Sequence, residues 1–167
     1  TPCSNIHSRI SIGLGASSLA ISAIPFSNKS FANDRNKLTS FKDITTYNNY
    51  YEFGTSKSDP YRNSQIFKTT PWEISIEGEV EKPIILSMEE ISEMFVSEER
   101  IYRLRCVEGW SMVIPWMGFS LSELLSKVNP TNKAKFVEFE SVYDPAQMKG
   151  QRYPVLNWPY NEGLRID

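Results

Sequence analysis

The order of the amphipathic segments is the feature that most limits the fold of this chain. Apolar and polar residues alternate from Trp72 to Glu77, a second apolar run covers Ile84 to Leu86, and a helical pattern opens at Ser87. Alternation with a period of two is typical of half-buried strands, and a Ser followed three residues later by Glu90 is a helix capping box. The first part of the chain therefore predicts strand, strand, helix.

The same patterns return further along the chain. Strands are predicted over residues 101–106, 112–114 and 137–141, the second of them stopped by Pro115. A second helix opens at Ser120, with Glu123 as its capping-box partner, and ends at Asn129 before a proline. Residues 55–70 and 144–167 show no hydrophobic periodicity and are expected to be irregular. Because strands and helices do not alternate regularly, we expect an α+β fold with mixed sheets and short helices.

Composition excludes several classes of function. The 167 residues suffice for one domain with a core, and the net charge of −2 gives no reason to expect a nucleic-acid partner. One His and two Cys cannot form a zinc site of closely spaced Cys and His ligands. No glycine-rich phosphate loop follows a predicted strand.

Residues 1–32 have the pattern of an export signal. They contain Arg9, Lys29 and no acidic residue, and Ile10 to Phe26 is an apolar run rich in small residues. The run is too short and too rich in Gly and Ser for a membrane span, and small residues precede a cleavage point before Asn33. The alternative is a buried N-terminal helix. Cleavage would remove one of the two cysteines and the only histidine.

Two segments of different character follow the predicted cleavage point. Residues 33–46 are polar and read as an extended linker. Tyr47 to Gly54 then holds four aromatic residues among amides and one acid, a pattern of neither a clean helix nor a clean strand. The segment is either an aromatic arm packed across the core or a loop that offers ring faces and amides to a flat heterocycle.

Cys106 is the residue on which the functional reading depends. A nucleophilic thiolate normally needs a base such as His, and the only histidine, His7, lies in the predicted signal. A redox pair would need a second cysteine, which cleavage removes. A buried structural cysteine and a metal ligand remain, and spacing alone favours the buried residue. A single Cys could hold a metal only with ligands from a cofactor or from outside this chain.

The stretch from Arg105 to Phe119, which reads RCVEGWSMVIPWMGF, closely resembles the cysteine segment of the catalytic subunits of bacterial periplasmic protein-methionine-sulfoxide reductases. These are molybdopterin enzymes of the sulfite oxidase superfamily. The Tyr47 to Gly54 stretch, YNNYYEFG, resembles the N-terminal cofactor loop of the same family. The resemblance implies the N-terminal part of a molybdopterin-binding oxidoreductase domain over 47–167 and part of the sulfite oxidase fold.

The resemblance also implies site residues. Cys106 would be the one protein ligand of molybdenum, with two further sulfurs from the dithiolene of molybdopterin. Asn48, Tyr51 and Glu52 match positions that contact the pterin and its phosphate, and Ser141 stands where the family has a Thr. Further contacts in the family lie beyond the matched part, and no catalytic residue is assigned. For Glu108 we hypothesise a role in tuning protonation near the metal, the alternative being a solvent-facing or Arg-paired carboxylate.

The implied reaction is oxygen-atom transfer from methionine sulfoxide in oxidised periplasmic proteins, which restores methionine. Electrons would come from the quinone pool through a haem-containing membrane subunit. Export to the periplasm is expected by the twin-arginine route, although the segment shows one arginine, Arg9, rather than a pair. The alternatives are a non-catalytic truncated module without cofactor and a molybdopterin reductase of small sulfoxides or N-oxides.

Overall fold

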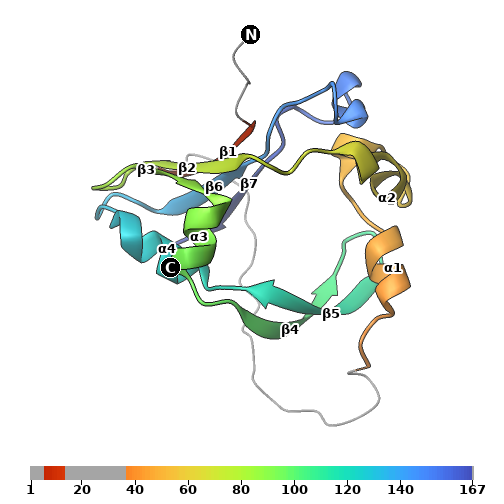
Figure 1. Cartoon of the computed structure of the whole chain (residues 1–167), viewed down its shortest axis with the longest axis horizontal. Helices are drawn as coiled ribbons and strands as arrows, with labels where there is room; N and C mark the ends of the chain where they lie inside the picture. Colours follow the sequence, from red (N-terminus) through yellow and green to blue (C-terminus); the bar gives the residue numbers. More distant parts are fainter. Residues whose placement is uncertain (1–5, 14–36, 167) are drawn as a thin grey trace.

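Two sheets organise the part of the chain that the computed structural model describes, residues 6–13 and 37–166. A five-stranded sheet has the order β3-β2-β1-β6-β7, and β4 and β5 form a separate two-stranded sheet (Figure 1). The strands are β1 (Ile6–Gly13), β2 (Trp72–Gly78), β3 (Ile84–Ser87), β4 (Glu98–Arg105), β5 (Ser111–Gly118), β6 (Phe136–Glu140) and β7 (Asn161–Arg165). β1 and β2 are parallel and the other pairs are antiparallel, which confirms the predicted mixed sheet.

Short helices connect the strands, as the α+β prediction expects. The α-helices are α1 (Phe41–Thr46), α2 (Asp59–Asn63), α3 (Met88–Met94) and α4 (Leu121–Val128), and the 3-10 helices are η2 (Tyr51–Phe53), η3 (Ser64–Ile66) and η4 (Lys149–Arg152). α3 and α4 lie on one face of the larger sheet, and the β4–β5 hairpin lies beyond them (Figure 1). No helix of the described ranges combines the length and the apolar character that a membrane crossing requires.

The main core fills the space between the five-stranded sheet and helices α3 and α4. Its most buried side chains are Ile12, Ile76, Val128 and Val137, all below 2% exposed. Phe95 and Phe119 stack at its margin, with ring centroids 4.2 Å apart. The alternating apolar residues of β2 and β6 therefore meet one side of α3 and α4 in this layer, whereas Met88, Met94 and Leu104, which the patterns also place on apolar faces, stay exposed.

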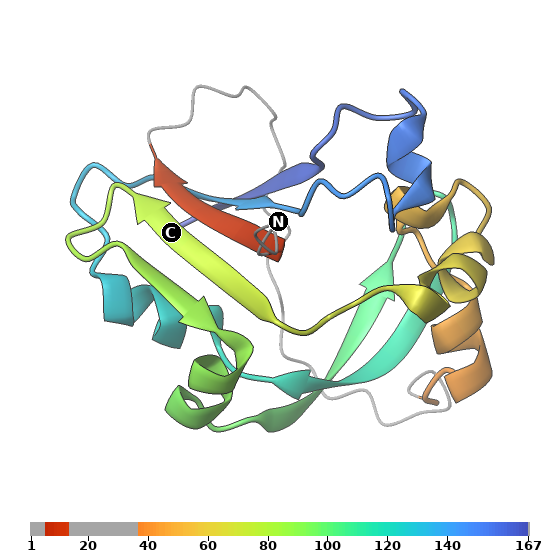
Figure 2. The same ribbon diagram turned by 45° about the horizontal axis from the view of Figure 1, so that its top comes forward.

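β1 lies at the centre of the larger sheet, between β2 and β6 (Figure 2). Ile10 pairs with Ile76 on one side and Phe139 on the other, and both Ile10 and Ile12 are buried. These residues fall inside the predicted export signal. Within residues 1–32 the structure describes only residues 6–13, and they form this strand. The alternative reading of a buried helix is wrong for residues 6–13. Residues 14–32 and the predicted cleavage point lie outside the described residues.

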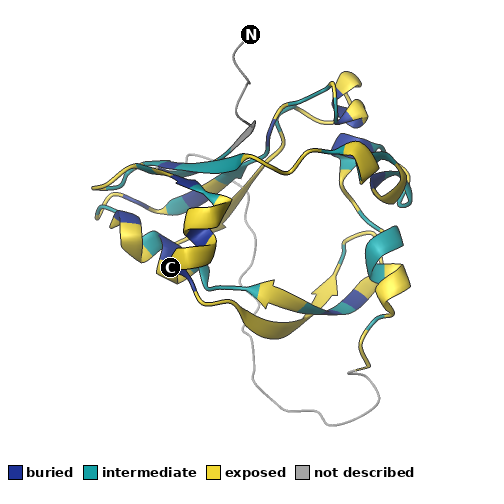
Figure 3. Cartoon of the chain, in the orientation of Figure 1, coloured by how far each residue is buried: buried dark blue, intermediate teal, exposed yellow. Residues whose placement is uncertain are grey.

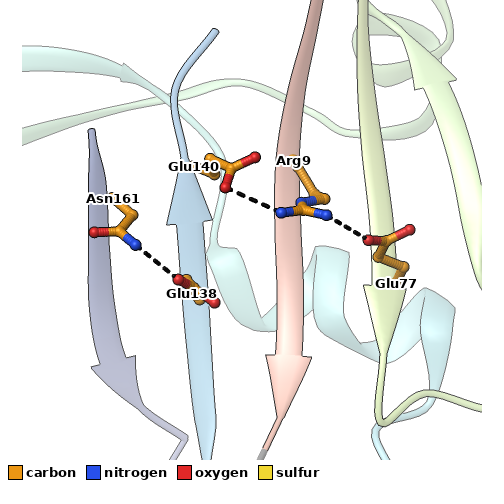
Figure 4. Close-up of polar contacts among 5 residues, drawn as sticks. All are labelled: Arg9, Glu77, Glu138, Glu140 and Asn161. Carbon is orange, nitrogen blue, oxygen red and sulfur yellow. Dashed lines mark hydrogen bonds and ion pairs between the residues drawn. The ribbon is translucent and has the colours of Figure 1, made fainter. Parts of the chain in front are cut away.

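The opposite face of the same sheet carries polar side chains. Arg9 of β1 donates to Glu77 of β2 at 3.2 Å and to Glu140 of β6 at 3.0 Å, and Asn161 donates to Glu138 at 3.0 Å (Figure 4). The hydrogen bond and charge of Glu140 raise the pKa of Arg9. Exposed ion pairs contribute little, about 0–1 kcal/mol. The buried isoleucines of β1 therefore hold it in place, and Arg9 helps to set its register.

The two predicted capping boxes differ in outcome. Ser87 accepts from the amide of Glu90 at 3.1 Å, and the Glu90 side chain accepts from the amide of Ser87, so this box is confirmed. The second box is wrong, because the Ser120 side chain makes no cap bond and its hydroxyl contacts that of Ser122. The second helix still ends as predicted, at Asn129 in the left-handed conformation.

Several elements form where no period is visible in the sequence. α1 lies in the predicted linker, α2 in the segment read as a loop, and β7 in the C-terminal stretch. α1 buries no residue and begins at Ser40, whose hydroxyl accepts from the amide of Asp43. β7 is exposed along its length and pairs with β6. Local capping therefore stabilises α1 and strand pairing stabilises β7, whereas α2 has no side-chain cap and buries Pro60.

β5 continues through Pro115, where the sequence predicts its end. Val113 directs its amide and carbonyl toward Thr39, away from β4. Pro115 lies two residues further along, so its nitrogen faces the same outer edge. Proline is tolerated there because no ladder hydrogen bond is lost. β4 is exposed along its whole length, whereas β5 buries Met112 and Ile114 (Figure 3).

A second, smaller core supports the segment that follows α1. Phe53, Val142 and Met148 are buried together, and the ring of Phe67 packs edge-on against that of Phe53. Gly150 of η4 lies directly against the backbone of η2, where an added Cβ would fall 1.9 Å from the carbonyl oxygen of Tyr51. The absence of a side chain at Gly150 thus allows the two short helices to touch.

A chain that begins at Asn33, the predicted mature N-terminus, is expected to unfold at a lower temperature than the full chain and to bind a hydrophobic dye. Loss of β1 leaves facing edges of β2 and β6 unpaired and exposes Ile76 and Val137, while each buried isoleucine contributes about 1.5–3 kcal/mol. Calorimetry and dye fluorescence measure this. A chain that begins at Ile6 is the control. Equal unfolding temperatures for all three chains would contradict the sheet as described.

Gly150→Ala is expected to destabilise the protein by about 1–3 kcal/mol, because the new Cβ forces η4 away from η2. Gly118→Ala is the matched control, since a Cβ at Gly118 meets no atom within 4 Å. Urea denaturation of both variants measures the effect. If the two substitutions change the unfolding free energy equally, the close approach of η4 and η2 is not what Gly150 provides.

Candidate active site

Cys106 lies in the tight turn that joins β4 to β5. Its amide donates to the carbonyl of Trp110 at 2.9 Å, and the amide of Gly109 donates to the carbonyl of Cys106 at 3.1 Å. Gly109 has a φ of +86°, a conformation that glycine adopts without strain. The chain reversal therefore places the thiol at the end of a strand, where the sequence predicts it.

The thiol of Cys106 is free and partly exposed, and the residue belongs to neither hydrophobic core. A buried structural cysteine, which spacing alone favours, is therefore not what the structure shows. Among the described residues no group of three or more His, Cys, Asp and Glu side chains could hold a metal. A metal at Cys106 would take its other ligands from a cofactor, and an accessible soft thiolate fits that arrangement.

The aromatic segment after α1 packs against this turn. The Asn49 side-chain amide lies 3.6 Å from the sulfur of Cys106. The ring of Tyr47 meets that of Trp110 edge-on, with centroids 5.5 Å apart. Phe53 alone enters the small core, while Tyr47 and Tyr50 stay exposed. The segment thus anchors one aromatic residue in the small core, as the first of the two predictions expects, and brings Asn49 and Tyr47 to the Cys106 turn.

Glu108 joins the turn to the aromatic segment. Its carboxylate accepts from the hydroxyl of Tyr51 at 3.1 Å and from the indole of Trp110 at 3.2 Å. Lys57 forms an ion pair with it at 2.5 Å, and the Asn49 amide lies 3.5 Å away. Two residues of the aromatic segment, one lysine that follows it and one residue of the turn therefore converge on one carboxylate, two positions from Cys106.

These contacts favour the charged form of Glu108. The hydrogen bond from Lys57 is the largest cause, followed by that from Trp110, and together they lower the pKa of Glu108 to about 2. The same contact raises the pKa of Lys57. Glu108 is therefore a fixed negative charge at neutral pH, paired with a lysine rather than with an arginine as the sequence reading allowed.

Glu52 and Ser141, two of the residues expected to bind the cofactor, lie together. Glu52 is only 8% exposed, and the hydroxyl of Ser141 lies 3.4 Å from its carboxylate. The amide of Ser141 donates to the carbonyl of Tyr160 at 2.9 Å. Since Glu52 follows Tyr51 in η2, a continuous series of contacts leads from Cys106 to Ser141.

Asn48 is placed differently from the other expected contacts. Its side-chain amide donates to the carbonyl of Thr45 at 3.0 Å. It borders a shallow hollow between α1, η2 and α2 that is also lined by Tyr50, Phe53 and Tyr61. No hydrogen bond among the described residues joins Asn48 to Cys106 or Glu108. The structure therefore brings together Cys106, Tyr51, Glu52 and Ser141, and leaves Asn48 at the side of the group.

Sequence reasoning does not identify Asn49 and Lys57 as members of the site. Asn49 is an amide in the same aromatic segment as Asn48, so the segment itself was the available signal. Lys57 lies in a stretch without period, and it reaches Glu108 only because the chain folds back after η2. No pattern in the sequence indicates that ion pair.

Glu108→Gln is expected to reduce stability at neutral pH and to matter less as the solution is acidified. Because the folded pKa of about 2 lies below the ordinary 4.5, the charged form stabilises the fold above pH 4.5. That contribution is lost as pH falls from 4.5 toward 2. Unfolding temperatures across this range measure it, with Glu93→Gln, an exposed carboxylate on α3, as the control. A constant difference between wild type and Glu108→Gln at all pH values would refute this account.

Comparison with known proteins agrees with this geometry. Residues 61–167 match the oxidoreductase molybdopterin binding domain. The chain is 57% identical over 131 residues to the protein-methionine-sulfoxide reductase catalytic subunit MsrP of Burkholderia mallei, which covers 78% of this chain and 40% of that protein. It is 56% identical over 131 residues to MsrP of Xanthomonas axonopodis pv. citri, covering 78% of this chain and 41% of that protein.

A third relative is equally similar. MsrP of Pseudomonas syringae pv. tomato is 54% identical over 132 residues, covering 78% of this chain and 39% of that protein. The chain thus spans about two fifths of the length of the curated relatives that it matches. The match over residues 61–167 includes the Cys106 turn and Ser141. By this match the chain belongs to the family of oxidoreductase molybdopterin-binding domains.

Proposed function

We propose that this protein takes part in the molybdenum-dependent reduction of methionine sulfoxide in periplasmic proteins. The observation that carries the proposal is the free, partly exposed thiol of Cys106, set beside an aromatic segment in a chain of the molybdopterin-binding family. The relatives named as protein-methionine-sulfoxide reductases support the substrate class. In the reaction a sulfoxide, two electrons and two protons give methionine and water.

The residues present suit a molybdopterin cofactor. Cys106 would supply the one protein ligand to molybdenum, and Tyr51, Glu52 and Ser141 would lie along the pterin and its phosphate. Asn48 would join them from its place between α1 and η2. When bound, the cofactor supplies the two-electron oxygen-atom transfer chemistry that protein side chains lack.

The chain's own residues position this centre. The Tyr47 and Trp110 rings join the aromatic segment to the Cys106 turn, and Asn49 offers its amide toward the sulfur. A thiolate needs such donors, because metal binding deprotonates the thiol and leaves a negative charge at the turn. Glu108 keeps its own charge, so it does not exchange protons at neutral pH and serves as a fixed acceptor for Tyr51 and Trp110.

Location and electron supply are part of the same proposal. The small-residue, acid-free N-terminal segment supports export to the periplasm, and the twin-arginine route is proposed for it although it contains one arginine, Arg9, rather than a pair. Electrons would come from the quinone pool through a haem-containing membrane subunit. The similarity to catalytic subunits supports a partner of this kind, because a catalytic subunit acts with other subunits.

A non-catalytic module is the second candidate, and the length of the match favours considering it. The chain spans about two fifths of its relatives, so the whole enzyme's activity does not transfer automatically to it. A reductase of small sulfoxides or N-oxides shares the cofactor and differs only in substrate. Cofactor content distinguishes the reductase from the non-catalytic module, and substrate preference distinguishes it from a reductase of small sulfoxides or N-oxides.

The full chain, produced in a host that makes molybdopterin, is expected to carry close to one molybdenum per chain. Cys106→Ser should lower that content at least about tenfold, because it removes the soft ligand. Cys3→Ser, which changes the other cysteine, is the control and should retain the metal. Metal analysis of the purified proteins measures this. A folded chain without molybdenum would favour the non-catalytic module.

Substrate class is tested with the same preparation. We expect faster reduction of an oxidised, methionine-sulfoxide-containing test protein than of free sulfoxides or N-oxides at equal concentration of oxidised groups. Mass spectrometry of the test protein measures the return of methionine. A preference for the small compounds would support a molybdopterin reductase of small sulfoxides or N-oxides.

A further inference from the structure

The aromatic segment and Lys57 close into a loop that the structure holds at both ends. The amide of Asn48 donates to the carbonyl of Lys57 at 2.9 Å, so residues 48–57 return on themselves. At its base, Phe53 is buried in the small core and η2 rests on Gly150. We call residues 47–57 the docking loop.

The docking loop meets the Cys106 turn mainly through Glu108. Tyr51, Asn49 and Lys57 of the loop all contact this carboxylate, and the ring of Tyr47 against Trp110 is the apolar contact beside them. Lys57 has the shortest contact, and its side chain is 22% exposed. Its ammonium also lies 5.5 Å from the centre of the Tyr51 ring. One lysine therefore ties together the two ends of the loop and the turn.

Charge gives this lysine a specific role. Metal binding would make Cys106 a thiolate, and Glu108 is already negative, so two anions would face one another across the Asn49 amide. Two negative charges that share the Asn49 amide repel each other, and partial burial strengthens the repulsion. Lys57 is the cation that pairs with Glu108, which leaves the Asn49 amide available to the sulfur.

We propose that Lys57 is a positioning residue that docks the 47–57 loop onto the Cys106 turn through Glu108 and prepares the site before the cofactor binds. The geometry of the docking stands on the contacts above. Its purpose, preparation of a molybdopterin site, rests on the proposed function. In this proposal Lys57 contacts the Glu108 carboxylate and does not itself contact the cofactor.

Hydrogen exchange of the cofactor-free full chain tests the docking. Lys57→Met keeps the length of the side chain and removes its charge, and we expect amide exchange over 47–57 to rise about two- to fivefold, the range of a partly exposed ion pair. Lys57→Arg should restore slow exchange. Lys42→Met, an exposed lysine on α1, is the matched control, and exchange in α4 should stay constant in every variant.

A double-mutant cycle makes the test specific. If Lys57 acts through Glu108, then Lys57→Met combined with Glu108→Gln should loosen the loop no more than Glu108→Gln alone. Raising the salt concentration should reproduce part of the effect in the wild-type protein, because ions screen a partly exposed pair. Unchanged exchange in Lys57→Met, or additive effects in the double variant, would overturn the proposal.

Molybdenum content of the same variants separates this inference from the proposed function. Lys57→Met with a loosened loop and several-fold lower molybdenum content supports both. A loosened loop in Lys57→Met, together with a wild-type protein that never binds molybdenum, overturns the proposed function and leaves the docking intact. Normal loop exchange with low molybdenum in Lys57→Met overturns docking, since the lysine would then act on the cofactor directly.

Discussion

The pairing of β1 with both β2 and β6 is the interaction on which the larger sheet depends. β1 contributes Ile10 and Ile12 to the core and completes the hydrogen-bonding edges of two strands at once. A central strand pairs with a neighbour along each of its two edges, whereas an edge strand such as β7 pairs along one edge and stays exposed. The place of residues 6–13 in the sheet therefore links the fold to a segment that also has the pattern of an export signal.

The site is supported by different interactions from those of the sheet. The small core of Phe53, Val142 and Met148 holds η2, and Gly150 allows η4 to touch it. Cys106 lies at the tip of the β4–β5 hairpin, where β4 is exposed along its length and would not by itself fix the thiol in place. Contacts from the docking loop to Glu108 bring the two parts together. Stability and site geometry thus depend on separate sets of residues, which substitutions can perturb independently.

A fixed charge beside the thiol alters the role expected for Glu108. A carboxylate that titrates near neutral pH could move protons, but Lys57 and Trp110 lower the pKa of this one to about 2. Its chemistry is therefore that of an acceptor that holds Tyr51, Trp110 and Lys57 in place. The match to the molybdopterin-binding family supports a centre in which the protein orients and the cofactor reacts.

Local pattern determined much of the fold. Alternation over 72–77, the capping box at Ser87 and the helix end at Asn129 are confirmed, because each depends on neighbours within a few residues. The position of Cys106 at the end of a strand, and the α+β class with mixed sheets, followed from the same patterns. The family followed from two motifs, around Cys106 and around Tyr51.

Tertiary structure alone decided what depends on distant segments. The strand at 6–13 and the exposed strand β7 form because partners elsewhere in the chain pair with them, and β5 passes through Pro115 because its nitrogen faces the edge away from β4. The second capping box failed because Ser120 bonded Ser122 instead. The ion pair of Lys57 with Glu108 joins residues that no spacing rule connects, since the charges meet only after η2 turns the chain back. Sequence by itself thus predicted most of the candidate site residues, and long-range packing decided which of them meet.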